Sequence, residues 1–340
     1  MMDAYEIQAG SGLSSLKKTN RTSLPLPANG LRLRMKAAAL NSRDLSVARG
    51  QFTGLQPHPV VPLVDGCGEV VETGPDVTRF RVGDRVIPTY YPGWLDGRIS
   101  PHKTATSFGV QIDGTLTTEM VGPENGFTRA PRNLDDAEAA TLCCAGLTAW
   151  NALFVAGAAR PGARVLLLGT GNVSIMALVL AKAAGLSVII TSSQDERLQR
   201  ARALGADETV NYRLNPEWQE DVLRQTEGTG VDLVLEVGGE HTLPRSLKAT
   251  AVGGRVVVIG RLSGGGDVPI STGALIGGSR SLSGITAGSR TMLEDLIRFV
   301  EVNGIRPVMD TRFSFENAAS AYEHFASDRP FGKVAITIDS

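Results

Sequence analysis

The segment of residues 164–193 restricts the fold more than any other part of the chain. It begins with residues 164–168, which are apolar after Arg164, a pattern typical of a strand buried on both faces in a parallel sheet. A glycine-rich turn follows, then apolar residues at helical spacing up to Gly185, and then a second apolar run at residues 188–191. Strand, turn, helix and strand within about thirty residues form a βαβ unit, which predicts an α/β domain here.

The turn has Gly169, Gly171 and Ser174 at the three positions of a G-x-G-x-x-G motif. The first glycine permits a tight turn, and the second lets backbone N–H groups approach a pyrophosphate at the positive end of the helix. Serine departs from the motif but is small enough to keep helix and strand close. An ordinary βαβ unit without a nucleotide is the alternative. The predicted cofactor contacts in this turn are Gly169, Gly171, Asn172 and Val173.

Composition excludes several classes of protein. The 340 residues, 42% of them hydrophobic, are enough for two domains. A formal net charge of −1 gives no reason to expect nucleic acid or an anionic membrane as a partner. Cys67, Cys143 and Cys144 are odd in number and suggest no disulfide framework, which favours a reducing cytoplasm. Neither a signal peptide nor an apolar run long enough to span a membrane is recognisable.

The two parts of the chain differ in their patterns. Residues 1–131 contain short alternating strands and proline-rich connections, whereas helical periodicity begins near Asp135. The end of the chain, with strands near Arg312 and at residues 334–338, is expected to return to the first domain. We therefore predict one domain from residues 1–131 and 287–340 and a second from residues 132–286. Six strands separated by helices or long loops fit a doubly wound parallel sheet in the second domain: residues 164–168, 188–191, 209–212, 231–237, 255–260 and 281–286.

Motifs along nearly the whole chain carry a family resemblance. In chain order they are residues 39–44 (ALNSRD), 65–71 (DGCGEVV), 82–86 (VGDRV), 146–150 (GLTAW), the glycine turn, 202–207 (RALGAD), 211–213 (NYR) and 253–255 (GGR). With them the chain resembles the medium-chain dehydrogenase/reductase superfamily, and most closely its zinc-free quinone oxidoreductase-like and alcohol dehydrogenase-like branch. The resemblance implies an α/β protein with a GroES-like β-barrel catalytic domain and a Rossmann domain that binds NADP(H).

The residues at the family's zinc positions depart from its pattern. Zinc dehydrogenases of this family hold the metal with a cysteine, a histidine and a third ligand. Here Asn41 stands at the first position and Val64 where the histidine is needed, and only Cys144 matches. The four histidines of the chain lie far apart in sequence. One thiolate without an imidazole partner does not make a three-ligand site, so we expect no metal.

Three residues are predicted to act on the substrate. Asn41 offers an amide that can hydrogen-bond a substrate oxygen or the cofactor near the nicotinamide, although capping of the following segment is an alternative. Tyr90 and Tyr91 lie in a proline-flanked loop, where they either line a substrate pocket or only pack the loop. Thr148 resembles the family residue that contacts the nicotinamide or ribose, and a helical threonine bonded to its own backbone is the alternative.

The end of the second strand of the βαβ unit predicts the cofactor. NAD-selective folds place an acidic residue there, whereas this strand ends in Thr-Ser-Ser-Gln. The hydroxyls of Ser192 and Ser193 can donate hydrogen bonds to a 2′-phosphate. Arg197 is placed to form an ion pair with that phosphate, and Tyr212 is a neighbour. A solvated charge beside two acidic residues is the alternative for Arg197. We expect a preference for NADPH.

The missing zinc ligands also bear on the reaction. Hydride transfer to a saturated carbonyl concentrates charge on one oxygen and requires a Lewis acid or a well-placed proton donor. A conjugated acceptor spreads that charge into an enolate. We therefore predict a zinc-independent, NADPH-dependent reductase of small enones, enals or quinones, and a homodimer that pairs through the strand at residues 281–286. A metal-free alcohol dehydrogenase or aldehyde reductase, and a catalytically idle NADPH-binding protein, are the alternatives.

Overall fold

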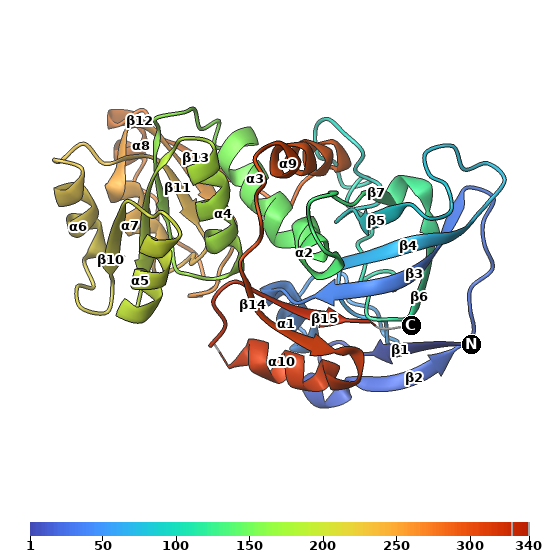
Figure 1. The fold of residues 1–340 in the computed structure, drawn as a ribbon. Helices are drawn as coiled ribbons and strands as arrows, with labels where there is room; N and C mark the ends of the chain where they lie inside the picture. The colour runs from blue at the N-terminus through green and yellow to red at the C-terminus, as the bar shows by residue number, and fades with distance from the viewer. Residues whose placement is uncertain (265, 328, 339–340) are drawn as a thin grey trace. The chain divides into compact units, whose positions relative to one another are not determined.

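The chain divides into two compact units (Figure 1). The computed structural model describes residues 1–264, 266–327 and 329–338. The first unit comprises Met1–Leu147 and Gly288–Ser340, and the second comprises Thr148–Ala287. The division differs from the expected one because residues 132–147 go with the first unit. Helix α2 (Asp136–Ala140) in this segment packs its buried alanines against strands of that unit.

The first unit is built on a mixed sheet. Its strands lie in the order β14-β15-β3-β4-β5-β7, and β6 also pairs with β3. Strand β15 is antiparallel to β3 and parallel to β14, and a separate antiparallel pair is formed by β1 and β2. The strands are β1 (Met2–Glu6), β2 (Lys17–Arg21), β3 (Gly30–Ala39), β4 (Asp65–Thr73), β5 (Arg85–Pro88), β6 (Glu119–Pro123), β7 (Phe127–Arg129), β14 (Met309–Ser314) and β15 (Lys333–Thr337).

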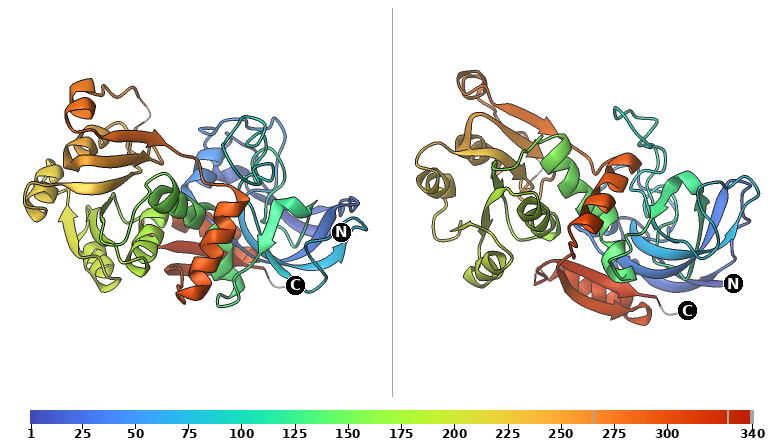
Figure 2. Two further views of the ribbon diagram at one scale, coloured as in Figure 1. Left: turned by 90° about the horizontal axis from the view of Figure 1, so that it is seen from above. Right: turned by 45° about the horizontal axis from the view of Figure 1, so that its top comes forward.

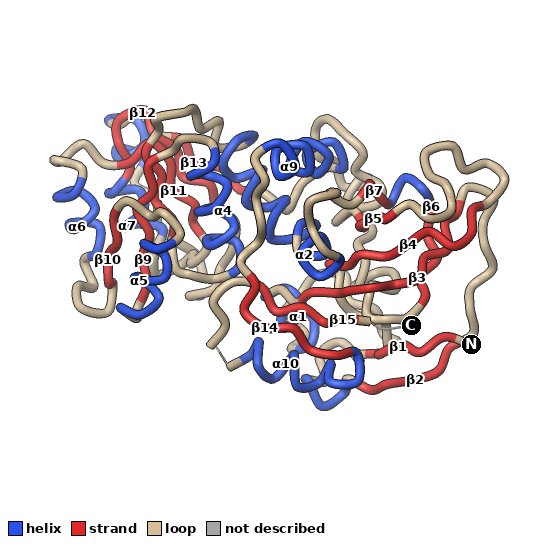
Figure 3. Tube along the Cα trace, viewed as in Figure 1, coloured by secondary structure: helices blue, strands red, loops and turns tan. Residues whose placement is uncertain are grey.

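Helices and one long loop complete the first unit. Its helices are α1 (Ser42–Ala48), α2, α9 (Arg290–Val302) and α10 (Ala318–Ala326). The connection from β5 to β6, residues 89–118, forms no helix or named strand and runs as an irregular loop (Figure 3). This loop contains Tyr90, Tyr91 and Trp94, so their positions depend on side-chain packing rather than on a regular backbone.

The second unit contains the predicted doubly wound sheet. All six strands are parallel, in the order β10-β9-β8-β11-β12-β13. From β8 the chain first adds strands on one side, β9 and β10, and then on the other side, β11 to β13. In folds of this type, nucleotides bind at the point between β8 and β11 where the strand order reverses. The strands are β8 (Arg164–Leu167), β9 (Ser187–Ser192), β10 (Glu208–Asn211), β11 (Val231–Glu236), β12 (Thr250–Val258) and β13 (Ser281–Gly284).

Helices lie on both faces of this sheet (Figure 2). They are α4 (Asn172–Ala183), α5 (Asp195–Ala203), α6 (Trp218–Gln225), α7 (Leu243–Ala249) and α8 (Thr272–Gly277), after the short α3 (Leu147–Trp150) at the boundary. Trp218 and Val222 of α6 join Leu243 and Leu247 of α7 in one core with the strands. Among the described residues, no helix has the length and apolar character needed to cross a bilayer.

One helix begins later than the sequence predicts. Proline is common in the first turn of a helix, which would place Pro216 inside α6, but the first residue of α6 is Trp218. The Oδ1 atom of Asn215 accepts a hydrogen bond from the backbone N–H of Glu217 at 3.0 Å. This side-chain turn competes with the helix and keeps Pro216 outside it.

Candidate active site

The glycine turn connects β8 to α4 in the second unit. Gly169 has φ +71, a conformation that disfavours other residues. Gly171 has an ordinary φ of −80, and a Cβ added there would meet nothing within 4 Å. The fold itself therefore does not require a glycine at position 171. A ligand that approaches this backbone closely would require one, because a side chain would occupy the space. Asn172 and Val173, the other predicted contacts, are the half-buried first residues of α4.

The serine that replaces the third glycine has a structural role. Ser174 is buried, and its hydroxyl donates a hydrogen bond to the backbone oxygen of Leu168 at 2.7 Å. The backbone N–H of Gly169 donates to the hydroxyl of Thr191 at 3.0 Å. These two bonds tie the turn to the end of β8 and to the end of β9, so the departure from the motif preserves the close packing of helix and strand.

Hydroxyl groups and one guanidinium gather where β9 ends. The hydroxyls of Thr170 and Ser192 are 3.5 Å apart, and Nη1 of Arg197 donates to the Thr170 hydroxyl at 3.5 Å. The backbone N–H of Tyr212 donates to the backbone oxygen of Ser192 at 3.1 Å, and Tyr212 is 41% exposed. Ser193 follows directly and is half-buried. The structure thus brings together these predicted cofactor residues.

Thr170 is a residue of this group that the sequence analysis missed, although it is the middle residue of the G-x-G turn. Nearby, the carboxylate of Asp195 accepts a hydrogen bond from Nδ2 of Asn211 at 2.7 Å. Asp195 therefore has a hydrogen-bond partner other than Arg197. Thr148, the remaining predicted contact in the second unit, is buried in α3.

In the first unit, Asn41 is the N-cap residue of α1, and its amide is held at both ends. Its backbone N–H donates to Oδ2 of Asp44 at 2.8 Å. Its Nδ2 donates to Oδ2 of Asp65 at 2.9 Å, and its Oδ1 accepts from Nζ of Lys333 at 2.7 Å. Asn41 is buried. One Nδ2 hydrogen remains for which the described residues give no acceptor.

Asp65 and Lys333 form a buried ion pair that the sequence analysis did not identify. Nζ of Lys333 lies 2.8 Å from Oδ2 of Asp65, and both residues are at most 1% exposed. The other carboxylate oxygen of Asp65 accepts from the backbone N–H of Cys144 at 2.8 Å. The sequence does contain one indication of this pair: a lysine begins the apolar strand at residues 333–337. A charge buried in a core needs a partner of opposite charge.

These residues do not form a ligand set that suits zinc. Val64 is fully buried and apolar. Burial, and then the charge of Asp65, raise the pKa of the Cys144 thiol, which favours the protonated form that binds metal poorly. Lys333 already presents a cation to Asn41 and Asp65. In the described part of the chain, no three His, Cys, Asp or Glu side chains gather as a metal site would require.

Arg43 connects this region to the two predicted tyrosines. Its guanidinium carbon lies 4.6 Å from the ring centre of Tyr90, and Nη2 donates to the backbone oxygen of Phe108 at 3.1 Å. The rings of Tyr90 and Tyr91 meet edge to face with centres 4.6 Å apart. Burial raises the pKa of Tyr90 well above its usual value, so its hydroxyl keeps its proton and can donate a hydrogen bond.

The buried carboxyl of Asp44 is also perturbed. Burial raises its pKa to about 6, and this effect exceeds the opposing influence of Arg43, whose Nε lies 4.0 Å from Oδ1. Asp44 holds the backbone of Asn41 in the first turn of α1. Its contacts are those of a residue that fixes this loop.

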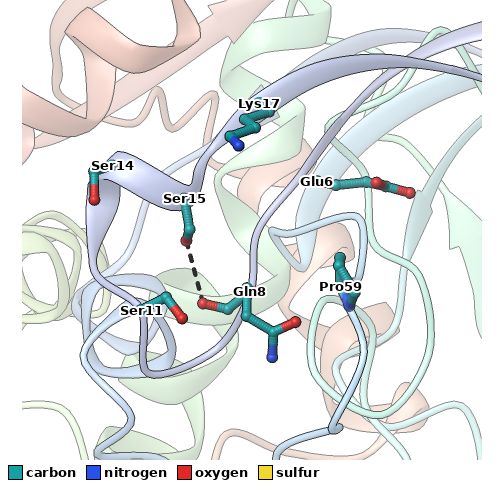
Figure 4. Close-up of a pocket in the computed structure, with 7 residues that line it drawn as sticks. All are labelled: Glu6, Gln8, Ser11, Ser14, Ser15, Lys17 and Pro59. Atoms are coloured by element: carbon teal, nitrogen blue, oxygen red, sulfur yellow. Dashed lines mark hydrogen bonds between the residues drawn. The ribbon is translucent and has the colours of Figure 1, made fainter.

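A surface pocket lies elsewhere in the first unit (Figure 4). Its volume is about 300 Å³, and the hydroxyl of Ser15 donates to the backbone oxygen of Gln8 at its wall. None of the predicted site residues lines it. The lining residues are Glu6, Gln8, Ser11, Ser14, Ser15, Lys17 and Pro59.

A parallel sheet with a glycine turn, joined to a unit with a mixed sheet, defines the class of two-domain nicotinamide-dependent oxidoreductases. Residues 27–132 match the family model of the alcohol dehydrogenase GroES-like domain, and residues 172–302 match that of the zinc-binding dehydrogenases. The chain belongs to the medium-chain dehydrogenase/reductase superfamily. It is therefore an oxidoreductase enzyme, and the predicted combination of a GroES-like and a Rossmann-like domain is confirmed.

The known proteins that are similar to this chain include proteins named as alcohol dehydrogenases and one named as a quinone oxidoreductase. A zinc-type alcohol dehydrogenase-like protein from Schizosaccharomyces pombe is 40% identical over 312 residues, which cover 90% of each chain. A crystal structure of an NAD-dependent alcohol dehydrogenase is 34% identical with a TM-score of 0.89, covering 99% of this chain and 100% of that one. The quinone oxidoreductase of Pseudomonas syringae pv. tomato is 25% identical with a TM-score of 0.82, covering 99% and 100%.

Proposed function

We propose that the protein is a zinc-independent, NADPH-dependent oxidoreductase that transfers hydride to a small activated acceptor, an enone, an enal or a quinone. The observation that carries this proposal is the Asn41 amide, which stands at the family's first metal-ligand position and is bonded to the Lys333 ammonium. A site of this kind offers hydrogen bonds in place of a Lewis acid. Hydrogen bonds are sufficient when the reaction delivers a delocalised enolate rather than an alkoxide.

Preference for NADPH is supported by the residues at the end of β9. A 2′-phosphate needs cationic and hydroxyl donors, and Arg197, Thr170 and Ser192 provide them, with successive contacts of 3.5 Å. The strand ends without the acidic residue that would bond a ribose 2′-hydroxyl and repel a phosphate.

A nicotinamide bound at the glycine turn would supply hydride, which an enone or enal would accept at the carbon remote from its carbonyl. The carbon–carbon double bond of this acceptor would be reduced at the expense of the cofactor, and negative charge would develop on the carbonyl oxygen. The remaining Nδ2 hydrogen of Asn41 and the neutral hydroxyl of Tyr90 are the donors proposed for that oxygen, and the Tyr91 ring packs against the Tyr90 ring. Solvent supplies the proton that completes the saturated product.

The test follows NADPH oxidation by chelator-treated enzyme with conjugated acceptors and with saturated aldehydes of matched size. We expect enones or quinones to react and saturated aldehydes to react much more slowly. Equal rates for both classes, or alcohol oxidation at a comparable rate, would favour the second candidate.

That second candidate is a metal-free alcohol dehydrogenase or aldehyde reductase, and the alcohol dehydrogenase names of similar proteins favour it. It requires a proton donor close to the carbonyl oxygen. An idle NADPH-binding protein would bind the cofactor in the same assay but would oxidise it with none of the acceptors.

We also propose a homodimer in a reducing cytoplasm. Strand β13 is the last in the sheet order, and all four of its residues are exposed. An exposed edge strand can pair with its copy from a second subunit. The three cysteines are free thiols, which suits a compartment where disulfides do not persist.

A further inference from the structure

Lys333 is the first residue of β15, and its amine lies among three oxygen acceptors. Nζ donates to the backbone oxygen of Leu40 at 2.8 Å, to Oδ1 of Asn41 at 2.7 Å and to Oδ2 of Asp65 at 2.8 Å. A neutral amine has only two N–H bonds, whereas these three acceptors need three. The side chain is therefore an ammonium ion, enclosed in protein and 1% exposed.

The ammonium joins segments that are far apart in sequence. Leu40 and Asn41 lie between β3 and α1, and Asp65 begins β4. Through its other oxygen, Asp65 also holds the backbone N–H of Cys144. The buried cation thus holds Asn41 directly, and through Asp65, the neighbour of Val64, it is linked to the backbone of Cys144.

Strand pairing alone does not explain why the charge is present. Strand β15 already pairs with β3 through the backbone at residues such as Ala335 and Ala39. A buried ion pair is often no more stabilising than apolar residues of similar volume, because both charges lose their hydration. The buried Lys333 ammonium is therefore better explained by a role in orienting the polar groups of the site than by a contribution to the stability of the fold.

We infer that Lys333 is a positioning residue whose ammonium does here what a metal ion does in a zinc dehydrogenase: it is the cation that orders the site. It fixes the Asn41 carboxamide with its oxygen toward Lys333 and its nitrogen toward Asp65. This inference rests on the proposed zinc-independent function. The same arrangement explains how the site stays ordered without a metal.

The test is chemical rescue of Lys333→Ala. The variant lacks three methylene groups and the ammonium, which together correspond to n-propylammonium. We expect Lys333→Ala to lower kcat by ~10-fold to 100-fold because Asn41 loses its fixed orientation, while the KM for NADPH stays unchanged. Added n-propylammonium should restore at least part of kcat and raise the unfolding temperature in a concentration-dependent way.

Two controls separate this effect from a general salt effect. Trimethylpropylammonium has the same charge but no N–H group, so it should not rescue. Lys182→Ala removes a lysine that is 30% exposed and paired with Asp207, and n-propylammonium should not affect it. Equal effects of the two ammonium ions on Lys333→Ala would overturn the inference. The unfolding temperature does not depend on the acceptor, so failure of rescue is distinguishable from a wrong assignment of the reaction.

A second variant covers the case in which Lys333→Ala does not fold. Lys333→Met combined with Asp65→Asn replaces the ion pair by neutral side chains of similar length, and the new amide oxygen at position 65 can still accept from the backbone N–H of Cys144. We expect this double variant to fold and to show the same loss of kcat. Wild-type kcat in the folded double variant would show that the ammonium does not position Asn41.

Discussion

Replacing Arg197 by alanine tests the proposed 2′-phosphate site. Arg197 lies on the first turn of α5, and its Nη1 reaches the Thr170 hydroxyl at the glycine turn. Both groups therefore lie in the region beyond the end of β9. NADH lacks the 2′-phosphate, so the variant should lose affinity for NADPH and leave the affinity for NADH little changed.

The size of the loss follows from the geometry. A hydrogen bond to a charged group contributes roughly 1.5–3 kcal/mol, which corresponds to about a 10- to 150-fold change in Kd. Arg197 is half-buried, so water and salt screen part of its charge. We therefore expect an increase in the Kd for NADPH of about 10- to 30-fold, near the lower end of that range.

The assay is an equilibrium fluorescence titration of both cofactors. Arg200→Ala is the matched control, because Arg200 is an exposed residue on the same helix, one turn further on. It should leave both Kd values unchanged. Raising the salt concentration should reduce the NADPH preference of the wild type more than that of Arg197→Ala. Equal losses for NADPH and NADH would assign Arg197 a structural role and refute the reasoning.

Further expectations concern the oxyanion, the metal and the dimer. Asn41→Ala should lower kcat by more than about tenfold, since loss of one oxyanion donor typically costs ~10²–10³ in rate; an unchanged kcat contradicts that role. Elemental analysis should find no stoichiometric zinc, whereas activity that a chelator abolishes and zinc restores would disprove zinc independence. Leu282→Lys on β13 should yield monomers in light scattering, unlike the control Val252→Lys at another exposed position; a stable Leu282→Lys dimer rules out this interface.

The sheet of the second unit could be predicted because its signals are local. The central strands β8 and β9 appear as largely apolar runs, and the glycine turn identifies the first of them. Errors arose where side chains compete with the backbone or where the chain bulges. Asn215 delays the start of α6, and β12 begins at Thr250 rather than Arg255, with an irregular register against β11.

The candidate site was harder to predict because its contacts are distant in sequence. Asn41 was identified from its position in a motif, but its partner Lys333 is 292 residues away. No periodic pattern connects the two. The boundary of the first unit was missed for a similar reason, since the alanines of α2 follow a helical period whichever unit they pack against.

The charges of the first unit bear on the chemistry that the proposed site can perform. Two buried cations, Lys333 and Arg43, lie near two buried acids, Asp65 and Asp44. With both acids ionised the formal charges cancel, so the group offers oriented hydrogen bonds rather than a net positive field. Oriented dipoles stabilise a charge spread over several atoms at little cost, whereas an alkoxide with its charge on one oxygen needs a cation or a proton at that atom. Under the proposed function, this buried arrangement therefore favours conjugated acceptors over saturated carbonyl compounds.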